Sequence, residues 1–237
     1  MTDWETEIAS SGEDAVIRGK PLEEVMEMDF PDAIWMLLTG EKPTEEESEI
    51  FNVILSSSID HGVGNPSTVA ARTVQSGGNE MNTSVAGGVL ALGDKHGGAI
   101  ESCMEMLQNG KEPREIVNDR LENDETIPGI GHKVYSDEDP RARKIVEKSE
   151  ELGIAGENVK KMAEIRDEFE EQKVDLVMNV DGAIAGVMSD LGWDHRLGKG
   201  IFIIARTPGL VAHVHEEMDE PDFRREKGEY KGEYKGE

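Results

Sequence analysis

Three histidines lie beside glycine residues, an arrangement that leaves room for a ligand or a backbone segment next to each imidazole ring. They are His61, before Gly62; His96, before Gly97 and Gly98; and His132, after Gly131. An imidazole changes its charge near neutral pH, so it can act in catalysis as a general acid, a general base or a hydrogen-bond donor. Each histidine taken singly is more often structural, so this pattern leaves the structural and the catalytic interpretations open.

Asp181 is a carboxylate within an apolar stretch of the sequence. It follows the residues VDLVMNV at 174–180 and precedes GAIAGV at 182–187. Burial among such residues disfavours the charged carboxylate and raises its pKa, which suits a general base. The alternative is that Asp181 is the N-cap of a helix that begins here. The spacing favours neither interpretation.

Two arginines, Arg141 and Arg206, are candidates for binding carboxylates. Arg141 lies in the segment DPRAR at 139–143, and Arg206 follows the apolar residues IFIIA at 201–205. A guanidinium group binds a carboxylate through two parallel hydrogen bonds, so both side chains suit an acidic ligand. In a chain rich in acidic residues they are equally suited to internal ion pairs.

Other chemical signals are weak. Residues 129–131 read GIG, without the third glycine and the preceding strand of a dinucleotide site. His213 and His215 are two residues apart within an expected helix, where such side chains point apart, and no ligand spacing resembles a zinc site. We therefore expect no metal, which disfavours a metal-dependent hydrolase. The single cysteine, Cys103, lacks the neighbours of a nucleophile and is expected in the core.

The chain is strongly acidic, since its 237 residues include 51 acidic and 25 basic ones for a net charge of −26. Neutralising phosphates needs a basic face, so we expect no nucleic-acid partner. Such a composition fits a disordered chain or a folded, halophilic protein, and apolar runs such as AIWMLL at 33–38 favour the folded one. The single cysteine and the lack of a signal peptide or a membrane-spanning run predict a soluble, cytoplasmic protein.

Helical patterns cover most of the chain and must position these side chains. Thr44 and Glu47 form a capping box, and glycines follow several of the apolar periodic segments. Helices are expected from Pro21 onward and at 32–38, 44–60, 67–76, 81–92, 99–108, 112–122, 139–152, 157–172, 181–191 and 198–217. A short ribbon near 15–18 is the one strand-like signal. The sequence therefore predicts an all-α fold, with residues 1–226 as one catalytic unit and 227–237 as a low-complexity tail.

The motifs, taken together and in this order, resemble the citrate synthase superfamily. The similarity begins with IRGKPLEEV at 17–25 and LLTGEKPT at 37–44, and continues with DH at 60–61 and NPST at 65–68. It extends through HGGA at 96–99, PGIGH at 128–132, DPR at 139–141, NVD at 179–181 and RTPG at 206–209. Each motif is short, but the ordered set is specific and covers most of the chain.

The resemblance implies a role for each of the residues singled out above. Asp181 matches the base that takes a proton from the methyl group of acetyl-CoA, His96 the donor to the thioester oxygen, and His132 the acid that polarises the carbonyl of oxaloacetate. This combination is coherent because enolising a thioester needs a base and an oxyanion donor acting together. His61, Arg141 and Arg206 match the groups that bind the carboxylates of oxaloacetate.

The resemblance also implies coenzyme A as part of the substrate and a homodimer as the assembly. Pro128, Gly129, Ile130 and Gly131 match the loop that lies along CoA, and Lys133 is a basic residue beside it that suits the CoA phosphates. The family's last substrate-binding arginine is donated across the dimer interface. Arg225, or its neighbour Arg224, is the nearest candidate for it in this sequence.

The length of the sequence favours one reaction within the family. It is shorter than full-length synthases, lacks much of their N-terminal helical region, and resembles the compact citryl-CoA lyases and the citryl-CoA lyase module of ATP-citrate lyase. His96 stands where ATP-citrate lyase has an aromatic residue. The leading hypothesis is cleavage of citryl-CoA into acetyl-CoA and oxaloacetate. The alternatives are synthesis of citrate or 2-methylcitrate, and a non-catalytic module that binds CoA or carboxylates.

Overall fold

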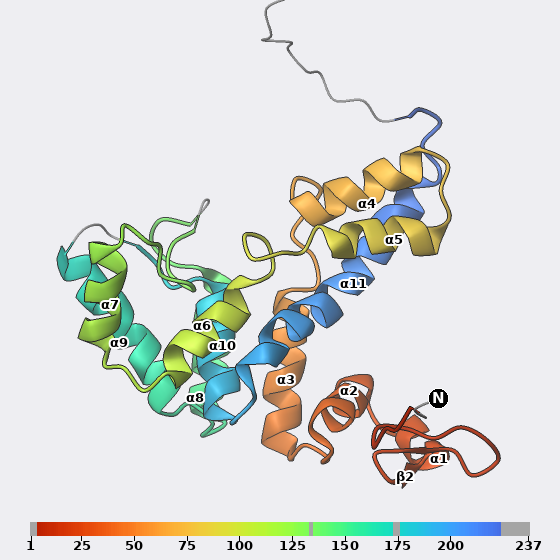
Figure 1. Ribbon diagram of the computed structural model, residues 1–237, viewed down its shortest axis with the longest axis horizontal. Coiled ribbons are helices and arrows are strands. Elements are labelled where there is room, and N and C mark those ends of the chain that lie inside the picture. The colour runs from red at the N-terminus through yellow and green to blue at the C-terminus, as the bar shows by residue number, and fades with distance from the viewer. Residues whose placement is uncertain (1–3, 133–134, 173–175, 224–237) are drawn as a thin grey trace, which may run out of the picture. The chain divides into compact units, whose positions relative to one another are not determined.

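The computed structural model describes residues 4–132, 135–172 and 176–223, and these are overwhelmingly helical (Figure 1). The helices are α1 (Leu22–Met26), α2 (Phe30–Thr39), α3 (Glu45–Ser57), α4 (Pro66–Ser76), α5 (Met81–Leu90), α6 (Ala99–Gln108), α7 (Pro113–Glu122), α8 (Pro140–Glu151), α9 (Glu157–Gln172), α10 (Val180–Asp190), the 3₁₀ turn η1 (His195–Leu197) and α11 (Gly198–Glu217). Strands β1 (Val16–Ile17) and β2 (Lys20–Pro21) pair in antiparallel fashion. The predicted all-α fold is confirmed, as is the short ribbon.

Local sequence signals explain where several helices begin and end. The capping box of α3 is present: Thr44 accepts a hydrogen bond from the backbone N–H of Glu47, whose carboxylate accepts one from Thr44. Gly40 ends α2 in the left-handed conformation, with a φ of 90° that favours glycine. Pro21 precedes α1 rather than standing in its first turn, because β2 includes it. None of the helices in the described ranges has the length and apolar composition needed to cross a membrane.

The chain forms two compact units, and each is discontinuous in sequence. Unit 1 comprises Met1–Ile59 and Asp94–Arg206, and unit 2 comprises Asp60–Gly93 and Thr207–Glu237. Helix α11 therefore contributes its first turns to unit 1 and the remainder to unit 2. The sequence patterns predicted no such division. The proposed tail at 227–237 lies outside the described residues.

Helix α10 forms the centre of unit 1. Val180 and the residues from Gly182 to Ser189 are buried, and the helix packs against α6, α8 and α9, which lie around it in Figure 1. Such a helix, apolar and small on all sides, is expected only in a protein interior. An aromatic cluster of Trp35, Phe51 and Trp193, with ring centroids 4.9–5.6 Å apart, fills a second part of the core.

In unit 2, α4 packs along α5 and against the C-terminal half of α11. Gly88 permits this close packing, because a Cβ there would lie 3.0 Å from both Ala71 and Leu210. Buried Arg72 donates to the carboxylate of Glu217 at 2.6 Å and joins α4 to the end of α11. Unit 2 is thus held by apolar packing and by one buried ion pair.

Candidate active site

The first turn of α10 places Asp181. The side-chain oxygen of Asn179 accepts hydrogen bonds from the backbone N–H groups of Asp181, at 3.0 Å, and Gly182, at 3.2 Å. Asn179 is therefore the N-cap and Asp181 the second residue of the helix, so the alternative interpretation of Asp181 as an N-cap is wrong. Sequence reasoning assigned no role to Asn179, although asparagine before a helix is a strong capping signal.

The loop at residues 128–132 is bound to the segment that leads into α10. Gly131 donates its N–H to the carbonyl of Val177 at 2.7 Å, and Asn179 donates to the carbonyl of Gly129 at 3.0 Å. The side-chain amide of Asn179 also donates to the carbonyl of Gly131 at 2.8 Å. The loop that the sequence analysis associated with CoA therefore lies directly against the start of the helix that carries Asp181.

Burial raises the pKa of the Asp181 carboxyl from its ordinary value of 3.8 to about 6. The guanidinium groups of Arg141 and Arg206 act in the opposite direction by favouring the carboxylate, while the charge of Asp139 adds to the increase. The expected pKa increase at Asp181 is confirmed. At neutral pH the group is a carboxylate with a pKa close enough to neutrality to take up and return a proton.

Asp139 organises the neighbouring part of the site, and sequence reasoning gave it no role. It is fully buried, and its carboxylate accepts hydrogen bonds from Arg141 Nε, at 3.0 Å, and Arg141 Nη2, at 2.8 Å. It also accepts from the backbone N–H of Val180 at 3.0 Å, which ties it to α10. Burial alone would raise the pKa of Asp139, but the hydrogen bonds from Arg141 and Val180 keep that pKa below its ordinary value. Asp139 is thus an ionised carboxylate that fixes Arg141.

His132 lies beside Arg141, with 3.2 Å between His132 Nε2 and Arg141 Nη2. The backbone N–H of Tyr135 donates to His132 Nδ1 at 3.1 Å, and Arg141, which can only donate, faces Nε2, so donors face both ring nitrogens. Burial lowers the pKa of His132, the charge of Arg141 lowers it further, and Asp139 partly offsets both. The imidazole is therefore neutral near pH 7 and can take up a proton, and the Arg141 guanidinium beside it is a hydrogen-bond donor.

Phe202 connects His96 to Arg206. The His96 ring lies 6.3 Å from the Phe202 ring in an edge-to-face arrangement, and Arg206 Cζ lies 4.8 Å from the centroid of that ring. Arg206 is 3% exposed and donates from Nε to the carbonyl of Ser58 at 2.9 Å. Contacts and electrostatic interactions thus connect His96, Arg206, Asp181, Arg141 and His132, all within unit 1. Arg141, one of the arginines considered for internal ion pairs, forms such a pair with Asp139.

His61 belongs to unit 2. It is exposed, in the turn between α3 and α4. The preceding Asp60 accepts hydrogen bonds from the N–H of Gly62, at 3.0 Å, and from His213 Nε2, at 3.1 Å. His213 therefore contacts a carboxylate that stabilises the His61 turn. Among the described residues there is no cluster of three His, Cys, Asp or Glu side chains suited to a metal.

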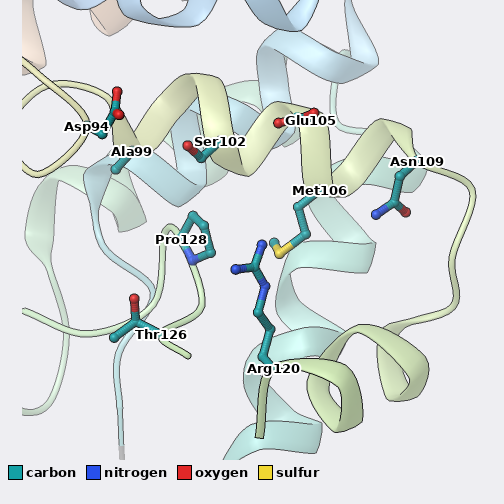
Figure 2. A pocket seen from close by; sticks show the side chains of 9 residues that line it. All are labelled: Asp94, Ala99, Ser102, Glu105, Met106, Asn109, Arg120, Thr126 and Pro128. Atoms are coloured by element: carbon teal, nitrogen blue, oxygen red, sulfur yellow. The ribbon is translucent and has the colours of Figure 1, made fainter. Parts of the chain in front are cut away.

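A cavity of about 540 Å³ opens beside Pro128 (Figure 2). Its lining comes from α6 and the residues that flank it, from the end of α7 and from the segment around the start of the 128–132 loop: Asp94, Ala99, Ser102, Glu105, Met106, Asn109, Arg120, Thr126 and Pro128. The Arg120 guanidinium points toward Met106 and Pro128, and Arg120 Nη1 forms an ion pair with Glu125 at 2.7 Å. The cavity is polar and adjoins the proposed CoA loop. Lys133 and Arg225, the other two predicted ligand-binding residues, lie outside the described residues.

Comparison with known proteins identifies the family of this chain. The family model for the C-terminal domain of citrate synthase matches residues 7–226. The chain belongs to the citrate synthase family. This membership confirms the resemblance inferred from the ordered motifs.

Individual members of the citrate synthase family differ in how much of their length this chain matches. It is 34% identical over 201 residues to the citrate synthase of Haloferax volcanii, covering 82% of this chain and 53% of the relative. The chain thus spans about half the length of that enzyme. The structure of citryl-CoA lyase from Hydrogenobacter thermophilus is 44% identical, with a TM-score of 0.90 over 99% of this chain and 95% of that one. Citrate synthase from Thermoplasma acidophilum, in a ternary complex with carboxymethyl-CoA and oxaloacetate, is 26% identical, with a TM-score of 0.75 over 88% and 58% of the two chains.

Proposed function

We propose that the protein is a citryl-CoA lyase, which cleaves citryl-CoA to acetyl-CoA and oxaloacetate. The observation that carries this proposal is the carboxyl of Asp181, which has a pKa of about 6 within reach of the charges of Arg141 and Arg206. Such a group suits proton transfer at the carbon next to a thioester. The similarity to the Hydrogenobacter citryl-CoA lyase, at 44% identity and a TM-score of 0.90, favours the lyase reaction among those of the family.

The proposed chemistry uses the three groups in complementary roles. As the carbon–carbon bond of citryl-CoA breaks, its electron pair forms the enolate of acetyl-CoA. The tertiary hydroxyl gives its proton to the neutral imidazole of His132, and its C–O group becomes the carbonyl of oxaloacetate. His96 donates a hydrogen bond to the enolate oxygen, and Asp181 in its protonated form delivers a proton to the enolate carbon. Arg141, whose Nη2 lies 3.2 Å from His132 Nε2, stabilises the negative charge that develops on this oxygen, and proton exchange with water then returns His132 and Asp181 to their starting states. In the condensing direction the same groups act in reverse.

Substrate binding follows from the neighbouring cations and from the loop. Arg141, Arg206 and His61 bind the carboxylates of the oxaloacetate portion. Coenzyme A lies along Pro128–Gly131, with part of it in the adjoining cavity, and Lys133 serves its phosphates. The CoA and oxaloacetate ligands of the Thermoplasma synthase are consistent with this assignment. We also propose a homodimer, in which Arg225 of one protomer reaches the substrate bound by its partner.

The second candidate is a synthase that condenses acetyl-CoA or a longer acyl-CoA with oxaloacetate. The similarity to the Haloferax citrate synthase favours it. A synthase forms the same carbon–carbon bond and then hydrolyses the thioester, so it releases free CoA. The two activities therefore differ in one product, which a simple assay detects.

Product analysis distinguishes these proposals. Purified protein is supplied in one reaction with citryl-CoA and in another with acetyl-CoA and oxaloacetate, and the products are separated by chromatography. A lyase gives acetyl-CoA and oxaloacetate in the first reaction and little free CoA in the second. Rapid CoA release in the second reaction would favour the synthase. If the wild type matches an Asp181→Asn control in both reactions, while still binding CoA in a titration, the protein is a non-catalytic module.

A further inference from the structure

Two sulfur-containing side chains are in contact in the core, next to the 128–132 loop and the start of α10. Cys103, on α6, and Met162, on α9, are both 0% exposed, and Cys103 Sγ lies 3.7 Å from Met162 Sδ. We refer to them as the sulfur pair. Neither has a chemical role in the proposed reaction, and the helices that carry them both pack against α10.

The sulfur pair fills the space where the proposed CoA loop, residues 128–131, crosses the first turn of α10. The backbones of Gly129 and Gly182 touch there, since a Cβ on Gly129 would lie 2.6 Å from the Cα of Gly182. The same Cβ would lie 2.9 Å from the methyl group of Met162 and 3.0 Å from Cys103 Sγ. A Cβ on Gly182 would come within 3.0 Å of the Met162 methyl group. No space is left for an additional carbon atom, so a larger sulfur pair must move the loop or the helix, and a smaller one leaves a void directly beside both.

Three segments that carry proposed catalytic groups meet at this contact. Helix α6 begins just after His96 and brings Cys103 to the contact, the loop continues from Gly129 to His132, and α10 carries Asp181 next to Gly182. Burial raises the pKa of the Cys103 thiol, and the charge of Asp181 raises it further, which shows that the thiol lies within electrostatic range of the carboxylate. The sulfur pair is thus the common support of the three segments.

We propose that Cys103 and Met162 are positioning residues for Asp181, whose volumes set the distance between the Asp181 carboxylate and the reacting carbon of the thioester. The proposal rests on the proposed function of Asp181 and of the CoA loop. A displacement of about 1 Å between reacting groups costs roughly a hundredfold in rate. A substitution that changes the volume of the sulfur pair should therefore lower kcat more than it weakens the binding of substrate.

The principal variant is Cys103→Ala, which removes the sulfur atom and leaves the rest of the helix unchanged. Cys103→Ser is the conservative variant, because it keeps an atom, though a smaller one, where the sulfur lies, and its hydroxyl can bond to the carbonyl one turn earlier in α6. Ile54→Val is the matched control. It removes one methylene from a fully buried side chain on α3, away from the three segments. Melting temperatures of all three variants report whether the fold is intact.

We expect Cys103→Ala to lower kcat about tenfold to a hundredfold, with KM for citryl-CoA changed less than about threefold. Cys103→Ser should recover most of the rate, and Ile54→Val should retain it at a similar melting temperature. A second readout does not depend on turnover: NMR titration of the Asp181 carboxyl. Water that enters the space left in Cys103→Ala should lower the pKa of Asp181 toward its ordinary value.

Two results would overturn the inference. One is a Cys103→Ala variant with wild-type kcat and an unchanged Asp181 titration. The other is an Ile54→Val variant that loses as much kcat as Cys103→Ala for the same loss of melting temperature, which would make the effect one of general stability. If the wild type turns over no acyl-CoA at all, the proposed function fails, and the NMR titration alone then decides whether the sulfur pair controls the surroundings of Asp181.

Discussion

Replacing Asp181 with asparagine should stabilise the free protein while it abolishes catalysis. Asparagine has nearly the shape of aspartate but no charge, so it avoids the cost of burying an ionised group in the first turn of α10. The difference between a pKa of about 6 in the folded chain and the ordinary 3.8 corresponds to about 3 kcal/mol at pH 7, at about 1.4 kcal/mol for each pKa unit. Because the asparagine amide also loses contact with water on folding, we expect a net gain of about 1–3 kcal/mol in the free energy of unfolding.

The size of this effect depends on pH. Because the folded chain binds the Asp181 proton more tightly than the unfolded chain, wild-type stability from this group rises as the pH falls from about 6 to 3.8. The advantage of Asp181→Asn should therefore be largest above pH 6, shrink through that window and disappear below it. Loss of a base that contributes about 10²- to 10⁴-fold should lower kcat by the same factor at every pH where the wild type is active.

Urea denaturation monitored by circular dichroism, at several pH values, measures the stability change. Asp14→Asn serves as the control, since Asp14 is exposed and its replacement removes the same charge from the surface. This comparison separates desolvation of Asp181 from the relief of repulsion in a chain of net charge −26. If Asp181→Asn is less stable than the wild type at pH 7, or no more stable than Asp14→Asn, the carboxylate is not held at a desolvation cost and the reasoning fails.

Three further predictions follow from the site and the surface. Exchange of the acetyl-CoA methyl protons with solvent, which requires the Asp181 carboxylate, should fall about tenfold for each pH unit below 6, whereas a rate independent of pH down to 5 would contradict the assignment. Asp139→Ala, which leaves Arg141 without its counter-ion and Val180 without its acceptor, should cost about 3 kcal/mol in urea denaturation and is contradicted by a loss below about 1 kcal/mol. Because the chain has a net charge of −26, salt should stabilise it by screening repulsion between its acidic groups. The melting temperature should therefore rise between about 0.1 M and 1 M KCl, as the Debye length falls from about 10 to about 3 Å. A melting temperature that does not change with salt would contradict a halophilic surface.

The sequence predicted the helices well because their ends depend on local signals. Thr44 and Glu47 lie three residues apart, and the capping box they form needs nothing from the rest of the chain. The helix predicted at 181–191 begins at Val180, one residue earlier, because Asn179 rather than Asp181 is its cap. The order of the motifs, rather than any one of them, gave the family.

The parts of the site that sequence reasoning missed depend on contacts between distant residues. Asp139 contacts Val180, 41 residues further on, and Asn179 binds Gly131, 48 residues earlier. Both residues stood in the quoted motifs, but no local pattern shows that one fixes Arg141 or that the other joins two segments. The division into two units was missed for the same reason, since unit 2 combines residues 60–93 with the chain from Thr207 onward.

The most direct test of the account is the fate of hydrogen when citryl-CoA is cleaved in D₂O. If Asp181 protonates the enolate, the acetyl-CoA produced by the wild type should carry one deuterium in its methyl group by mass spectrometry, and Asp181→Asn should form acetyl-CoA at least a hundredfold more slowly. Formation of deuterated acetyl-CoA at the wild-type rate by Asp181→Asn would contradict the central claim, because the proton would then come from another group.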